Sequence, residues 1–188
     1  MKVVLASRSP RRKELLGSIV DEFQIVTAET DETLPSGMHP CEGVELLAIR
    51  KGAAVLPAVD SDALVISSDT LVEIDDIPLG KPIDEADAVR ILLSLSGRTH
   101  RVHTGVAVHY RERVYSGVDT AYVTFFDFCE QEALEYVRTG EPMDKAGAYA
   151  IQGIGRKFVK TYRGEFDAIV GLGLKLTKKL IEKAVADE

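Results

Sequence analysis

The segment KVVLASRSPRRK, residues 2–13, decides how the fold begins and brings four cations together. Residues 3–6 are apolar and predict a strand, and the Ser9-Pro10 pair predicts a helix with Ser9 as its N-cap. The cations are Arg8, Arg11, Arg12 and Lys13. A strand that runs directly into a helix is typical of a mixed α/β protein.

The position of these cations predicts a phosphate site. A helix N-terminus already carries about half a positive charge, together with free backbone N–H groups. Arginines at this end oppose helix stability, and a bound polyanion is the simplest way to offset the repulsion. A solvated basic first turn is the alternative interpretation.

Composition limits the class of protein. The chain has 188 residues, of which 45% are apolar and 28% charged, as in a globular domain. We expect one domain over residues 1–188, or one domain with a small second lobe. The apolar runs are far shorter than the roughly 20 residues of a membrane helix, and the run after Lys2 is too short for a signal peptide. We therefore expect a cytoplasmic protein with no membrane partner.

Net charge and the residues that commonly bind metals argue against further classes. The net charge of −7 disfavours general binding to nucleic acid, so the positive charge that matters must be local. Cys41 and Cys129 lie far apart and predict free thiols rather than a zinc site or a disulfide. His100 and His103 are three residues apart in an expected strand, so they point to opposite faces and predict structural roles.

Hydrophobic periodicity predicts helices that alternate with strands, followed by a long β-hairpin. The expected strands are residues 2–6, 23–27, 63–67, 71–74, 77–79, 101–109 and 114–126, with shorter ones at 149–151, 157–161 and 168–170. The expected helices are residues 10–19, 41–56, 85–95, 130–139 and 172–185. These elements predict a mixed α/β fold in which helices flank a bent, elongated sheet and a ligand groove lies between its two halves.

Asp69 is the candidate catalytic residue. The apolar run over residues 63–67 predicts a buried strand, and Ser68, Asp69 and Thr70 follow at its carboxyl end. Carboxylates at such strand ends are typical of catalytic α/β sites, where Asp69 could bind a divalent cation or accept a proton from water. A turn aspartate that caps the strand is the alternative.

A second acidic group spans residues 29–32 and follows the strand expected at 23–27. Magnesium bound with a nucleotide usually takes one or two carboxylates together with phosphate oxygens. Glu32 and Asp69 could supply these carboxylates to Mg²⁺ or Mn²⁺. A solvated acidic loop would have the same sequence.

Two lysines and one glutamine are further candidate binding groups. Lys51 interrupts the apolar helical stripe of Leu47 and Val55, so it needs an anionic partner or an exit to solvent. Lys81 lies in a Gly-Lys-Pro turn that holds it where it can meet an anion. Gln152 lies among small residues, and its amide can read the amide edge of uracil or thymine.

Cations for a polyphosphate, carboxylates for a metal and an amide for a base are the parts of a nucleoside triphosphate hydrolase with a central nucleotide-binding groove. The chain has no Gly-x-x-x-x-Gly-Lys-Ser/Thr phosphate loop. Two other classes compete with this interpretation. They are a nucleotide-binding regulator without catalysis and a nucleic-acid binder that uses residues 8–13.

These motifs resemble the Maf family of nucleotide pyrophosphatases, whose fold is related to the inosine triphosphatase group. The resemblance spans nearly the whole chain. It rests on residues 5–12, 31–32, 51, 68–70, 80–82, 96–100, 104–106 and 146–153. The chain departs from the family's pattern at Ala168 and Gly173, where the family has Asn and Pro.

The resemblance implies metal-dependent hydrolysis between the α- and β-phosphates, which gives a nucleoside monophosphate and pyrophosphate. It assigns proton acceptance to Asp69. It links base choice to Arg12, Thr70 and Gln152, in the pattern of the branch that acts on dTTP and UTP rather than on 7-methyl-GTP. It also implies a homodimer and a role in restraining cell division or clearing modified nucleotides.

Residues and resemblance together give one expected arrangement of the site. The triphosphate ligands are Ser9, Arg11, Arg12, Lys51 and Lys81. Glu32 and Asp69 are the expected ligands of the divalent cation.

Overall fold

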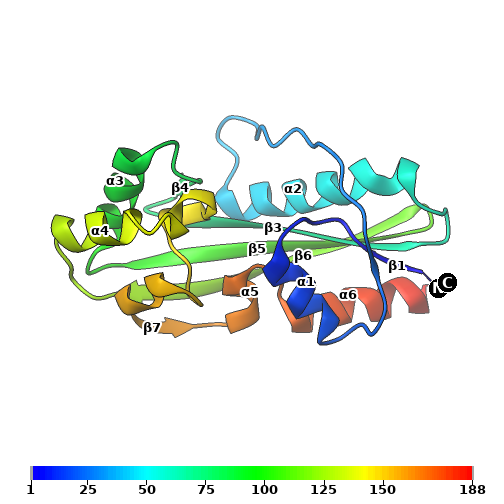
Figure 1. Cartoon of the computed structure of the whole chain (residues 1–188). Helices are drawn as coiled ribbons and strands as arrows, with labels where there is room; N and C mark the ends of the chain where they lie inside the picture. The colour runs from blue at the N-terminus through cyan, green and yellow to red at the C-terminus, as the bar shows by residue number, and fades with distance from the viewer. Residues whose placement is uncertain (1, 188) are drawn as a thin grey trace.

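A long mixed sheet runs through the length of the molecule (Figure 1). The computed structural model describes residues 2–187. The strands are β1 (Val3–Leu5), β2 (Gln24–Ile25), β3 (Leu64–Ile74), β4 (Ile77–Leu79), β5 (Thr99–Tyr110), β6 (Arg113–Phe125) and β7 (Val159–Arg163). Their order is β2-β1-β3-β5-β6-β7, and β4 pairs with β3 away from this path. Only the pairs of β1 are parallel among the described strands, so the expected mixed sheet is confirmed.

The helices alternate with the strands at the start of the chain and follow them at its end. The α-helices are α1 (Pro10–Gly17), α2 (Pro40–Val55), α3 (Glu85–Leu95), α4 (Glu130–Val137), α5 (Phe166–Val170) and α6 (Leu174–Ala186). The 3₁₀ helices are η1 (Leu56–Ala58), η2 (Glu141–Asp144), η3 (Ala146–Ala148) and η4 (Ile154–Phe158). Ser9 is the N-cap of α1, as the sequence predicts. None of the helices within residues 2–187 is both long and apolar enough to cross a membrane.

The two faces of the sheet are covered differently, as the alternation along β3 shows. Val65 packs with Val55 of α2, whereas Leu64 packs with Leu180 of α6. Farther along β3, Val72 belongs to the cluster that contains the buried residues of α3 and α4. Figure 1 accordingly shows α6 towards one end of the long strands and α3 with α4 at the other.

The middle of β3 is an open sheet edge. On one side β5 pairs with β3 throughout residues 64–73. On the other side β1 pairs with residues 64–66 and β4 with residues 72–74, so no described strand pairs with residues 67–71 there. Asp69 and Thr70 lie in this gap.

Three sequence expectations about local structure are wrong. The strand predicted at 63–67 does not end before Asp69, because β3 continues through the polar residues to Ile74. The polar side chains have buried partners, since the Ser67 hydroxyl donates to Ala48 O (2.7 Å). Residues 168–170 end helix α5 instead of forming a strand, and residues 149–151 form no strand.

Helix α2 approaches β5 so closely that only glycine fits at position 105. A Cβ atom there would lie 2.5 Å from the backbone oxygen of Val44. Backbone cannot move aside as a flexible side chain can, so any larger residue separates the helix from the sheet.

We predict that Gly105→Ala lowers the free energy of unfolding by about 1–3 kcal/mol, the usual range for overpacking. Denaturant unfolding measures this change. Gly17→Ala is the matched control, because a Cβ at Gly17 finds its nearest neighbour at 3.9 Å. A Gly105→Ala protein as stable as the control would contradict the close approach of α2 to β5.

Candidate active site

A groove of about 1040 Å³ lies against the open edge of β3. This volume is at the upper end of the range for small-molecule sites. The groove is lined by every site residue that the sequence predicts, from six separate segments of the chain. These residues are Ser9, Arg11, Arg12, Glu32, Lys51, Asp69, Thr70, Lys81 and Gln152. The structure therefore brings the whole predicted set together, although their individual roles stay predictions.

The start of α1 forms the cationic part of the groove. The Ser9 hydroxyl accepts a hydrogen bond from the Arg12 backbone N–H (3.4 Å), and the first turn of the helix contains no acidic residue. Arg8, Arg11 and Arg12 line the groove beside this turn. The positive end of the helix dipole and the arginines thus act on the same space, which favours a polyanion.

Arg12 is held by neutral groups only. Its Nε donates to Gly171 O (2.9 Å) and its Nη2 donates to the Thr70 hydroxyl (3.3 Å). Within residues 2–187, no carboxylate lies within ion-pair distance of this guanidinium. Burial lowers the pKa of Arg12, and the charge of Asp69 acts in the opposite direction. An anion bound in the groove would supply a negative partner for the charge of Arg12.

Lys51 joins two carboxylates from different segments. Its ammonium group forms an ion pair with Asp69 of β3 and lies 2.9 Å from Glu32 Oε1. The Lys51 and Asp69 side chains are only 18% and 12% exposed, whereas Glu32 is 59% exposed. The hydrogen bond from Lys51 is the main cause that lowers the pKa of Glu32.

The loop that carries Glu32 is fixed by Arg50. The Arg50 guanidinium donates to the backbone oxygens of Asp31 (3.3 Å) and Thr33 (2.7 Å), on either side of Glu32. Arg50 and Lys51 are neighbours in α2, so this helix holds both the backbone and the carboxylate of the loop.

Glu32 and Asp69 form a donor set that fits a magnesium or manganese ion. Both carboxylates reach the same ammonium group, so they converge on one position in the groove. Two carboxylate oxygens completed by phosphate oxygens of a nucleotide are the usual ligands of Mg²⁺. Lys51 contacts one oxygen of each carboxylate, so each carboxylate keeps a second oxygen that a metal ion could use.

A second group of metal-binding side chains lies away from the groove. His39, Glu73 and Asp76 bring ligand atoms within 4.8 Å of one another, but none of the three lines the groove. The Arg101 guanidinium already pairs with both carboxylates, and His103 lies 2.9 Å from Glu73. The two carboxylates of the group thus already have partners within the protein. These contacts also give His103 the structural role that the sequence predicts.

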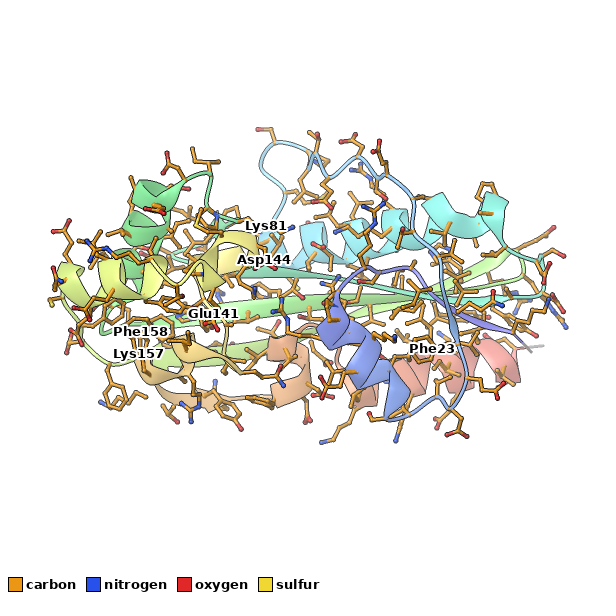
Figure 2. All side chains as sticks on the ribbon, in the orientation of Figure 1. Phe23, Lys81, Glu141, Asp144, Lys157 and Phe158 are labelled. Atoms are coloured by element: carbon orange, nitrogen blue, oxygen red, sulfur yellow. The ribbon has the colours of Figure 1, made fainter. Side chains whose placement is uncertain are left out.

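The far wall of the groove comes from the segment after α4. Figure 2 shows Lys81 and Asp144 on the same side of the sheet, with Glu141 in the neighbouring turn, and all three line the groove. Sequence reasoning missed Glu141, because no local pattern distinguishes it from an exposed glutamate. Its partners lie 5 to 14 residues away in the chain.

Gly173, where the family has proline, is the N-cap of α6 and lies against Asp119 of β6. A Cβ atom at Gly173 would overlap the carboxylate of Asp119, so a proline here would require the Asp119 side chain to move.

We predict that Lys51→Met raises the pKa of the Glu32 carboxyl, because the substitution removes the hydrogen bond that chiefly lowers it. An NMR titration of the labelled Glu32 carboxyl carbon measures the shift. Lys81→Met is the control and should produce a smaller rise, since Lys81 contributes only a longer-range charge effect. An unchanged Glu32 pKa in Lys51→Met would contradict the ion pair.

Comparisons with known proteins agree on one family. A family model described as "Maf-like protein" matches residues 2–184. The "dTTP/UTP pyrophosphatase" of Bacillus velezensis is 43% identical and covers 97% of this chain and 96% of its own length. The protein of the same name from Vibrio cholerae is 45% identical, with 97% of each chain covered.

A solved structure supports the fold alone. The structure of the Staphylococcus aureus Ham1 protein aligns with a TM-score of 0.54 at 14% identity, covering 96% of this chain and 88% of that one. This likeness confirms the expected inosine triphosphatase-like fold class. The match to the family model and the relatives above 40% identity show that the chain belongs to the Maf-like protein family.

Proposed function

We propose that this protein hydrolyses nucleoside triphosphates to the monophosphate and pyrophosphate, with dTTP and UTP as its preferred substrates. One observation carries the proposal: the cationic start of α1 and the carboxylate of Asp69 line the same groove. The names of the relatives from Bacillus velezensis and Vibrio cholerae support the reaction and the two substrates.

The cations of the groove bind the triphosphate in this proposal. Ser9, Arg11 and Arg12 hold phosphate oxygens at the start of α1, and Lys51 and Lys81 of the same groove add two further cations. Arg12 is preorganised for this task, because its hydrogen bonds to Gly171 and Thr70 fix the guanidinium before substrate arrives. These cations also offset the charge that develops on the departing pyrophosphate.

Asp69 acts on the attacking water. Its carboxylate accepts the proton as the water oxygen attacks the α-phosphorus and the bond to the β-phosphate oxygen breaks. The Lys51 ammonium holds the carboxylate in place at the open edge of β3. A magnesium or manganese ion bound by Glu32 and Asp69 would neutralise phosphate charge.

The base lies towards the wall formed by the segment after α4. Gln152 lines this part of the groove and offers one donor and one acceptor to the amide edge of uracil or thymine. Thr70 and Arg12 complete the proposed contacts to the base side of the nucleotide.

We propose one domain for the whole chain, since β3, β5 and β6 run through both halves and the family match spans residues 2–184. The homodimer, the cytoplasmic location and the absence of nucleic-acid and membrane partners stay predictions from the sequence.

We predict that Asp69→Asn keeps the fold and lowers kcat by about 10²–10⁴-fold, the usual effect of removing a general base. Pyrophosphate release from dTTP and UTP measures the loss. Asp76→Asn is the control, because Asp76 pairs with Arg101 outside the groove and should leave turnover unchanged. Near-normal release by Asp69→Asn would rule out the assignment of Asp69.

We also expect chelation with EDTA to abolish pyrophosphate release, and Mg²⁺ or Mn²⁺ to restore it. Glu32→Gln should raise the concentration of metal ion needed for half-maximal activity, because it removes one of two carboxylate ligands. Full activity in EDTA would contradict a metal at Glu32 and Asp69.

A nucleotide panel separates the competing interpretations. Purified protein is tested for pyrophosphate release from dTTP, UTP, CTP and 7-methyl-GTP. The proposal expects dTTP and UTP to be hydrolysed with the highest kcat/KM. A regulator without catalysis would bind a nucleotide and release no pyrophosphate, and a preference for 7-methyl-GTP would reassign the branch.

A further inference from the structure

A hydrogen-bonded clamp surrounds the turn that carries Gln152. The Glu141 carboxylate accepts hydrogen bonds from the backbone N–H groups of Ile154 and Gly155, both at 2.9 Å. On the other side of Gln152, the Tyr136 hydroxyl accepts a hydrogen bond from the Ala150 N–H (3.2 Å). Backbone on both sides of Gln152 is therefore fixed from outside the turn.

Glu141 and Tyr136 act as one unit. The Tyr136 hydroxyl donates to Glu141 Oε2 at 2.6 Å. Tyr136 is fully buried in α4, so the clamp rests on a rigid element. Burial and the neighbouring carboxylate raise the pKa of the Tyr136 hydroxyl, which keeps it a donor. Burial raises the pKa of Glu141, but its hydrogen bonds together outweigh burial and keep the carboxyl ionised.

The glycines of the turn allow the clamp to close. A Cβ atom at Gly153 would overlap the Glu141 carboxylate, and one at Gly155 would lie 2.6 Å from the Tyr136 hydroxyl. The Ile154 side chain between them is 53% exposed, so it does not anchor the turn by burial. On this side of Gln152 the Glu141 carboxylate is thus a principal anchor of the turn.

Gln152 itself is free to meet a ligand. It is exposed, it lines the groove, and its amide forms no hydrogen bond with any residue in the range 2–187. A free amide on a fixed backbone can report small differences between bases, because its position does not adapt to a wrong partner.

We propose that Glu141, supported by Tyr136, is a positioning residue that fixes the turn over residues 150–155 and so sets where Gln152 meets the nucleobase. This inference rests on the proposed function and adds a specificity-determining residue to it. UTP and CTP differ in the hydrogen-bonding edge of the pyrimidine, so their discrimination measures the placement of Gln152.

The experiment compares kcat/KM for UTP and CTP in the wild type, Glu141→Gln, Gln152→Ala and the double variant. Glutamine has one acceptor oxygen where Glu141 has two, so one backbone N–H loses its partner. We expect Glu141→Gln to reduce the UTP/CTP ratio by about tenfold through the KM for UTP, with kcat nearly unchanged. In the Gln152→Ala background the same substitution should change the ratio no further.

Glu132→Gln is the matched control. Glu132 also accepts a backbone hydrogen bond, from Cys129 at the start of α4 (3.0 Å), but it does not line the groove. Glu132→Gln should leave the UTP/CTP ratio of kcat/KM unchanged. Tyr136→Phe removes a single hydroxyl and should shift the ratio in the same direction as Glu141→Gln, which keeps the test available if Glu141→Gln folds poorly.

Two results would overturn the proposal. If Glu141→Gln leaves the UTP/CTP ratio of kcat/KM unchanged, whether or not both values fall, Glu141 does not act on base choice. A further drop in the ratio in the Gln152→Ala background would show that Glu141 acts on the base without Gln152.

Failure of the proposed function is recognised separately. If the wild type releases no pyrophosphate from any nucleotide, calorimetric binding of UTP and CTP to the same variants replaces kcat/KM. Hydrogen exchange of the Ile154 and Gly155 amides provides a readout without nucleotide, and it should accelerate in Glu141→Gln and not in Glu132→Gln. Unchanged exchange would refute the clamp itself.

Discussion

The arrangement of the groove depends on the two ion pairs of the Lys51 ammonium group. This group binds Glu32 from the loop before α2 and Asp69 from the middle of β3, so one charge connects a loop, a helix and a strand. Without it, two carboxylates would face each other at a partly buried position, where like charges repel more strongly than in bulk water. One ammonium group offsets half of the charge of the two carboxylates, so the cluster keeps a net negative charge.

The groove combines this acidic cluster with the guanidinium of Arg12. Among the residues that the structure describes, Arg12 has only neutral hydrogen-bond partners, and one of them, Gly171 O, also accepts a hydrogen bond from the Ser68 hydroxyl (2.6 Å). Thr70 in turn contacts Thr104, whose hydroxyl donates to Ala168 O (2.7 Å). The carbonyl oxygens at the end of α5 thus anchor both the arginine and the open edge of β3. A short helix far along the chain determines how the first helix presents its charge.

Sequence reasoning succeeded where the signal is local and failed where it depends on distant partners. Ser9 and Pro10 mark the start of α1, and regular apolar spacing marks α3 at its observed ends. Ser67, Ser68 and Asp69 suggested the end of a strand, because their partners Ala48, Gly171 and Lys51 cannot be inferred from neighbouring residues. The apolar run at 168–170 is too short to reveal its period, so the sequence predicts a strand where the structure has the end of α5. The role of Glu141 could not be predicted, because the backbone N–H groups that it binds, those of Ile154 and Gly155, belong to another turn.

The edges of the sheet offer little to an incoming strand of another molecule. At one edge β2 contains only two residues, and at the other β7 carries exposed Lys160 and Arg163. Short strands and charged side chains are the common protection against edge-to-edge aggregation. Two copies joined through β7 would set these cations against each other. These features disfavour extension of the sheet by edge-to-edge pairing between copies at β2 and β7.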